Sequence, residues 1–241
     1  MRNPQDSLVF PLDFNNLEEA LFWVERLKPF VGIFKVGLEL FVKEGPKVIE
    51  EIKKKGASKI FLDLKLFDIP NTVSGAVRAA SNYGVDYLTV HILAGRRTLD
   101  EALKAAKGGL KILGVTLLTS LDKADLLELG FNGELLYKTE DLVYKLTFLA
   151  NLVGCDGIVC SAKEVGLIKN SFPHLLTVVP GIRLEESSGD DQVRTATPYE
   201  AVKAGADLIV VGRPIKNSAS PEETCLIILQ EIKKAWEEKN V

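Results

Sequence analysis

Short apolar runs alternate with longer amphipathic stretches along the whole chain. Each run is rich in Val, Ile, Leu and Phe, and near-continuous apolar runs of this length are typical of parallel strands covered on both faces. The pattern predicts strands over 8–13, 32–38, 59–66, 87–92, 111–118, 157–162, 175–181 and 207–213.

The stretches between these runs have helical periodicity. Asn16 precedes a stripe of apolar residues and is placed to cap the first helix. Gly56 and Gly84 end two other helices, and a Ser or Thr followed by Pro opens the last two. The predicted helices are 16–28, 45–55, 71–84, 99–109, 141–154, 162–170, 197–205 and 220–239.

This alternation predicts a single (β/α)8 TIM barrel over residues 1–241. A doubly wound open sheet is the alternative. Segments 119–140 and 184–196 are long, polar connections that follow predicted strands. In a barrel such connections lie on the face that carries active sites, although passive surface loops would have the same composition.

Composition narrows the class of protein. The 241 residues include 30 Lys and Arg and 33 Asp and Glu, for a net charge of −3, so any positive field around an anionic substrate must be local. Three cysteines are too few for a disulfide framework, and no apolar run reaches the roughly 18 residues of a membrane helix. The polar N-terminal segment does not resemble a signal peptide. We expect a cytoplasmic protein that binds a small molecule, without nucleic-acid or membrane partners.

Charged residues at the carboxyl ends of the strands are the candidate catalytic residues, because barrel chemistry lies there. Asp63 and Lys65 are two apart, so both point into the barrel mouth if Leu62, Leu64 and Leu66 on the other face pack against the helices. Asp68 follows, and Lys35 and Asp13 end earlier strands. Charges in apolar strands are unfavourable unless they are paired or functional. We expect a functional charge array; a structural ion pair is the alternative.

The last two predicted strands each end in Gly and Arg. Gly181 and Arg183 follow the seventh strand, and Gly212 and Arg213 follow the eighth. Barrel phosphate sites are often built by these two loops, where glycine admits close backbone approach and arginine offers a planar fork of donors. We expect a phosphate site here; tight turns with surface arginines are the alternative. His91 is expected to be a structural, hydrogen-bonded histidine.

The segment FLDLKLFDIPNTV, with its D-x-K-x-x-D core, strongly resembles the signature of the orotidine 5′-phosphate decarboxylase family in its bacterial form. Related barrels that act on sugar phosphates share this core but use a magnesium ion held partly by a glutamate at the end of the second strand, where this chain has Lys35. Further segments match in order: LDF (12–14), FKVGLELF (34–41), VTLLTSL (115–121), DGIVCSA (156–162), TVVPGIR (177–183), DDQVRTATP (190–198) and IVVGRPI (209–215).

The resemblance implies decarboxylation of orotidine 5′-phosphate to UMP and CO2, the last step of UMP biosynthesis, without a metal or other cofactor. It implies that Lys65 stabilises and protonates the C6 carbanion and that Asp63 lies near the substrate carboxylate. It also implies a homodimer in which Asp68 and Thr72 reach the neighbouring site.

The resemblance implies further substrate-binding roles. Lys35 and Asp13 would bind the ribose hydroxyls, and Thr119 would contact the pyrimidine amide. Gln192, Gly212 and Arg213 would hold the phosphate, with Pro180 and Arg183 on the same wall. The alternatives are a metal-dependent sugar-phosphate decarboxylase or aldolase of a related barrel family, and a non-catalytic nucleotide-binding protein, which would have no use for the charge array.

Overall fold

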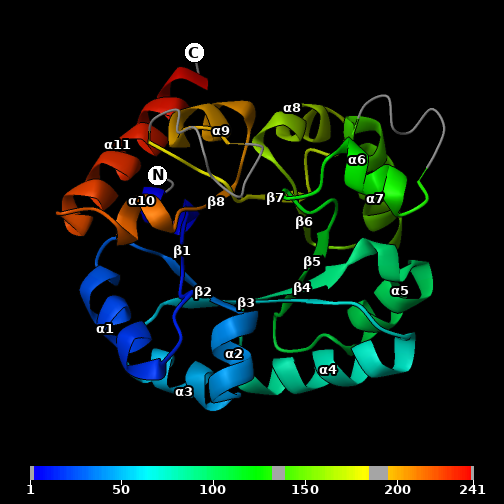
Figure 1. Cartoon of the computed structure of the whole chain (residues 1–241), viewed down its shortest axis with the longest axis horizontal. Coiled ribbons are helices and arrows are strands. Elements are labelled where there is room, and N and C mark those ends of the chain that lie inside the picture. Colours follow the sequence, from blue (N-terminus) through cyan, green and yellow to red (C-terminus); the bar gives the residue numbers. More distant parts are fainter. Residues whose placement is uncertain (1–2, 132–138, 185–194, 240–241) are drawn as a thin grey trace.

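Eight parallel strands close into a barrel in the computed structural model, which describes residues 3–131, 139–184 and 195–239 (Figure 1). Each strand pairs with the next along the chain, and β1 pairs with β8. The predicted (β/α)8 barrel is therefore confirmed, and the open sheet is wrong because no strand is left at an edge. The strands are β1 (Leu8–Pro11), β2 (Ile33–Gly37), β3 (Lys59–Leu66), β4 (Tyr87–His91), β5 (Lys111–Val115), β6 (Gly157–Val159), β7 (Leu176–Val179) and β8 (Leu208–Val210).

Helices form a ring around the strands (Figure 1). The short helices α2, α6 and α10 were not predicted, because seven, six and four residues are too few to produce a clear period. The helices are α1 (Leu17–Leu27), α2 (Leu38–Glu44), α3 (Lys47–Lys54), α4 (Pro70–Tyr83), α5 (Arg96–Ala105), α6 (Lys123–Glu128), α7 (Thr139–Val153), α8 (Ala162–Ser171), α9 (Pro198–Ala204), α10 (Arg213–Lys216) and α11 (Pro221–Lys239), with 3-10 turns η1 (Pro4–Ser7) and η2 (Ile92–Ala94).

The helix ends follow the capping residues. The Asn16 side chain accepts a hydrogen bond from the Glu19 N–H at 2.8 Å and so caps α1. Gly84 ends α4 in the left-handed conformation, with φ of 66°. These local signals explain why the sequence pattern located the longer helices to within a few residues.

The core has two parts. Helices and the outer faces of the strands share one apolar cluster, while a second, smaller cluster fills the inside of the barrel. Phe61 and Tyr87 meet edge to face within that inner cluster, with ring centroids 6.1 Å apart. Because side chains fill the barrel, a ligand has room only at its mouth.

The three cysteines are reduced and lie in the core. Cys155, Cys160 and Cys225 are free and buried, and burial raises the pKa of the Cys155 and Cys225 thiols to about 12. Within the described part of the chain, no helix combines the length and apolar character that a bilayer crossing needs.

The same aspartate clamp recurs three times at the amino-terminal end of the barrel. In each case an aspartate just before an even-numbered strand donates its backbone N–H to a residue of the preceding strand and accepts that residue's N–H on its carboxylate. The pairs are Asp86 with Ile60, Asp156 with Ile112, and Asp207 with Thr177. The clamps satisfy strand N–H groups that the sheet ladder leaves without a partner.

We expect Asp86→Ala to lower the free energy of unfolding by about 1–3 kcal/mol, because the Ile60 N–H loses a charged acceptor at 2.8 Å. Urea unfolding followed by circular dichroism measures this change. The matched control is Asp100→Ala, which removes only an i,i+4 ion pair with Arg96 at 3.8 Å on the surface. Equal effects of the two substitutions would show that the clamp contributes nothing beyond a surface charge.

Candidate active site

A cavity of about 260 Å³ opens at the carboxyl ends of the strands. Its lining comes from most of the strands, so the barrel brings together residues that are far apart in sequence. Apolar side chains of Pro11, Phe61, Val159, Val178 and Val210 line part of it. The other lining residues are Asp13, Lys35, Asp63, Lys65, Thr119, Pro180, Gly181, Arg183, Gly212 and Arg213.

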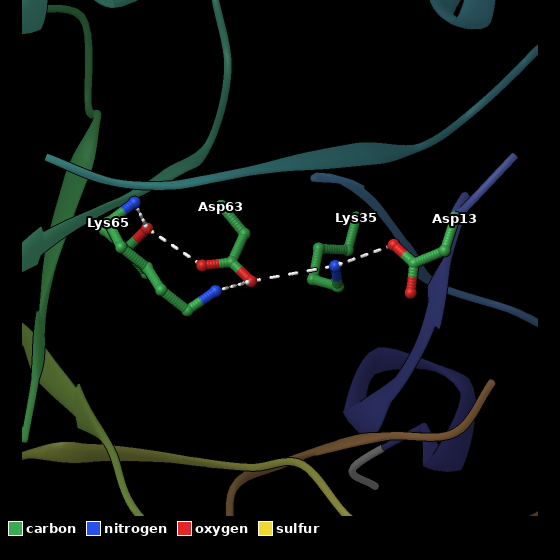
Figure 2. Close-up of polar contacts among 5 residues, drawn as sticks. Asp13, Lys35, Asp63 and Lys65 are labelled. Atoms are coloured by element: carbon green, nitrogen blue, oxygen red, sulfur yellow. Dashed lines mark hydrogen bonds and ion pairs between the residues drawn. The ribbon is translucent and has the colours of Figure 1, made fainter. Parts of the chain in front are cut away.

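Four charged side chains of alternating sign lie in a row at this cavity (Figure 2). The Lys65 Nζ donates to Asp63 Oδ2 at 2.8 Å, and the Lys35 Nζ lies 3.6 Å from the same oxygen. Lys35 also donates to Asp13 Oδ1 at 3.2 Å. Parallel pairing of β1, β2 and β3 produces this row, because it sets their carboxyl ends side by side.

Asp63 is ionised in this setting. Its side chain is almost fully buried, and burial by itself raises the pKa of a carboxyl group. The ammonium groups of Lys35 and Lys65, with hydrogen bonds from Lys65 and Thr89, outweigh burial and hold the pKa of Asp63 below its ordinary value. Two neighbouring lysines therefore share this carboxylate, and Asp13 supplies the second negative charge of the row through its contact with Lys35.

Strand β3 is irregular where it carries Asp63 and Lys65. Its pairing with β4 shifts between Leu62 and Leu66, and Lys65 has φ of 48°, the only positive φ of a non-glycine residue in the described part of the chain. Simple strand alternation therefore does not hold beyond Asp63. Both charged side chains still reach the cavity, as predicted, because the distorted backbone turns Lys65 toward Asp63.

Thr89 on β4 supports this irregular segment, and the sequence analysis did not single it out. Its hydroxyl accepts the Lys65 backbone N–H at 2.8 Å and donates to Asp63 Oδ1 at 2.9 Å. The available signal was the small polar residue Thr89 inside the run YLTVH, on the strand next to the charged one.

The opposite wall of the cavity is cationic. Gly181 has φ of 79°, and a Cβ on Gly212 would lie 2.8 Å from the Pro11 side chain, so both positions require glycine. Arg183 and Arg213 also line this wall, and burial together with the nearby Arg183 lowers the pKa of Arg213, against the pull of Asp13. Lysines and arginines outnumber carboxylates around the cavity, although the whole chain has a net charge of −3. The arrangement suits an anionic ligand.

Two predicted site residues among the described ones do not line the cavity: Asp68 and Thr72, which are exposed to solvent after β3. The predicted phosphate ligand Gln192 lies outside the described residues. His91 accepts the Leu93 N–H on Nδ1 at 3.3 Å, and burial and the nearby Lys65 lower its pKa, so it is a neutral, hydrogen-bonded side chain. Among the described residues, no three His, Cys, Asp or Glu side chains gather in a way that would hold a metal ion.

Comparisons with known proteins agree with this geometry. The model of the "Orotidine 5'-phosphate decarboxylase / HUMPS family" matches residues 6–226. The orotidine 5′-phosphate decarboxylase of Gloeothece citriformis is 42% identical over 94% of this chain and 97% of its own, and that of Desulfosudis oleivorans is 43% identical over 97% and 96%. The crystal structure of orotidine 5′-phosphate decarboxylase from Lactobacillus acidophilus, 34% identical, superposes with a TM-score of 0.80 over 94% of this chain and 99% of its own.

The lowered pKa of Asp63 predicts how stability depends on pH. Because the pKa is depressed in the folded state, ionised Asp63 stabilises the fold above the ordinary aspartate pKa of about 3.9, and this contribution is lost as the pH falls through the folded-state value. We expect Asp63→Asn to be less stable than the wild type by about 1–3 kcal/mol at neutral pH, with a gap that narrows on acidification below about pH 4. Urea unfolding across this range measures the gap, and a gap independent of pH would contradict the assignment.

Proposed function

The chain belongs to the orotidine 5′-phosphate decarboxylase / HUMPS family, and from that premise we propose that it converts orotidine 5′-phosphate to UMP and CO2, the last step of UMP biosynthesis. The observation that carries the proposal is the Lys65 ammonium, which lies 2.8 Å from the buried Asp63 carboxylate at a cavity with a cationic wall. This arrangement suits a reaction in which negative charge develops on carbon beside a proton donor.

We assign the phosphate and the nucleoside part of the substrate to different groups of cavity residues. The phosphate would bind near Arg183 and Arg213, where Gly212 and Gly181 bring the backbone close, with Gln192 and Pro180 completing the binding wall. Lys35 and Asp13 would bind the ribose hydroxyls, and Thr119 would contact the pyrimidine amide.

The chemical step would take place between Lys65 and C6 of the pyrimidine. The bond between C6 and the carboxylate breaks, CO2 leaves, and the electron pair stays on C6. The adjacent ammonium stabilises this charge and then transfers its proton to C6, after which solvent reprotonates the amine. Asp63 keeps the amine charged and directed at the cavity, and it lies near the substrate carboxylate.

We propose that the reaction needs no metal or other cofactor. Lys35 stands at the position where metal-dependent relatives would have a glutamate ligand, and its ammonium lies 3.6 Å from Asp63 Oδ2. A second cation beside Asp63 would be repelled by Lys35 and Lys65. The metal-dependent sugar-phosphate reaction is therefore not favoured.

The active assembly is proposed to be a homodimer. Large apolar side chains that follow β2, β3 and β4 are exposed, including Val42 at 77%, Phe67 at 64% and Ile69 at 67%. Phe67, Ile69 and Leu93 line a surface hollow together with Asp68. A second copy that covers this hollow would bring its own Asp68 and Thr72 toward the neighbouring site.

We expect the wild type to release CO2 and UMP from orotidine 5′-phosphate at the same rate with and without EDTA. Lys65→Ala should lose about a hundredfold to ten-thousandfold in kcat, because it removes the proton donor, while UMP binding remains measurable by calorimetry. Lys145→Ala, an exposed lysine on α7, is the control and should retain full activity. A folded wild type that does not turn the substrate over, or that requires magnesium, would refute the proposed function.

A mixture of inactive variants tests the shared site. Asp68→Ala and Lys65→Ala are each expected to have little activity, but after unfolding and refolding of an equal mixture about a quarter of the wild-type rate should return, because half of the dimers then contain one intact site. Mixing Lys65→Ala with Asp63→Ala is the control, since both residues lie in the same cavity and no intact site can form. No recovery in the first mixture would place Asp68 in its own subunit's site or outside any site.

A further inference from the structure

Lys65 is held in an unfavourable backbone conformation at the centre of the proposed site. Left-handed φ values are rare for residues with a side chain, and they persist only when the surroundings enforce them. Between the pairs Leu62 with Leu88 and Leu66 with Val90, residues 63–65 of β3 face Thr89 alone on β4. Regular ladder pairing cannot therefore satisfy every backbone group of this segment.

Thr89 occupies the place where the ladder is interrupted. It is fully buried, and it lies two residues after Tyr87, so its side chain shares the inner face of the barrel with the Tyr87 ring. Its hydroxyl accepts from the Lys65 backbone N–H and donates to Asp63 Oδ1. The direction of both bonds is certain, because a backbone N–H can only donate and a carboxylate can only accept.

These contacts connect both the backbone N–H and the side-chain Nζ of Lys65 to the Asp63 carboxylate. The backbone N–H reaches Asp63 through the Thr89 hydroxyl, and the Nζ reaches the other oxygen of the same carboxylate directly. The Thr89 hydroxyl therefore fixes the position of the Lys65 backbone and the orientation of the Asp63 carboxylate, which accepts the hydrogen bond of the Lys65 ammonium.

We propose that Thr89 is a positioning residue for the decarboxylation, and that its hydroxyl holds Lys65 and Asp63 in the geometry that the reacting carbon requires. Thr89 itself does not line the cavity, so it acts through these two residues and not by contact with substrate. The inference rests on the proposed function.

The test replaces the hydroxyl without changing the shape of the side chain. Thr89→Val leaves the Lys65 N–H without its acceptor and Asp63 Oδ1 without its donor, and Thr89→Ser restores both. We expect kcat of Thr89→Val to fall about ten- to hundredfold, since misplacement of a reacting group by about 1 Å has an effect of this size. KM and UMP affinity should change by less than about threefold, because the phosphate-binding wall is untouched, and Thr89→Ser should return to within about threefold of wild type.

Thr147→Val is the matched control. Thr147 is also fully buried, but its hydroxyl bonds the Val143 carbonyl within α7, so the same exchange should leave kcat unchanged. If Thr89→Val does not fold, Thr89→Ala removes the same hydroxyl with less crowding and takes its place.

A second measurement does not depend on turnover. The side-chain carboxyl of Asp63, assigned in 13C NMR spectra by its absence in Asp63→Asn, should titrate at a higher pH in Thr89→Val than in the wild type, because a hydrogen bond to the charged form has been removed. The other groups that face Asp63, Lys35 on β2 and Lys65 on β3, are the same in both proteins.

The outcomes separate the two hypotheses. A wild type without activity refutes the proposed function, and the Asp63 titration then decides whether Thr89 organises the pair. An active wild type whose kcat and Asp63 titration are both unchanged by Thr89→Val overturns the positioning role. Equal losses of kcat in Thr89→Val and Thr89→Ser also overturn it, because the hydroxyl would then not be the cause.

Discussion

One buried carboxylate shared by two lysines is the interaction on which the site depends. Without Asp63, the ammonium groups of Lys35 and Lys65 would face each other at the barrel mouth, with Asp13 as a carboxylate partner of Lys35 alone. With Asp63 present, the ammonium groups of Lys35 and Lys65 are held at fixed positions in the cavity before a ligand binds. Preorganised charge of this kind is effective in catalysis because it needs no rearrangement when the reaction begins.

The position of that carboxylate follows from the barrel and from a departure from regular strand geometry. Parallel pairing sets the ends of β1, β2 and β3 in line, so their charged side chains form a row. The break in register of β3 against β4 then turns Lys65 into the row, and Thr89 bonds the backbone there. The strain at Lys65 is tolerated because Thr89 on the neighbouring strand β4 holds its backbone N–H.

Barrel closure supplies the other half of the site. Pairing of β8 with β1 brings Gly212 against Pro11, so Arg213 reaches the same cavity as Asp13 and Lys35. A chain with net negative charge thereby concentrates positively charged side chains at one cavity, which suits an anionic ligand. The fold determines where these strand-end side chains meet, and the function that we propose for them rests on membership of the orotidine 5′-phosphate decarboxylase / HUMPS family.

The sequence by itself determined the order of strands and longer helices and predicted the barrel, because periodicity and capping residues are local properties of the chain. It also set Asp63 and Lys65 two residues apart, but their side chains meet through a backbone that regular strand alternation does not describe. Tertiary structure alone decided the left-handed backbone at Lys65 and the bonds of Thr89, since these depend on register between strands that local patterns do not encode. Tertiary structure also decided that Asp68 does not line the cavity at the barrel mouth, because the path of the loop after β3 is set by packing and not by local sequence.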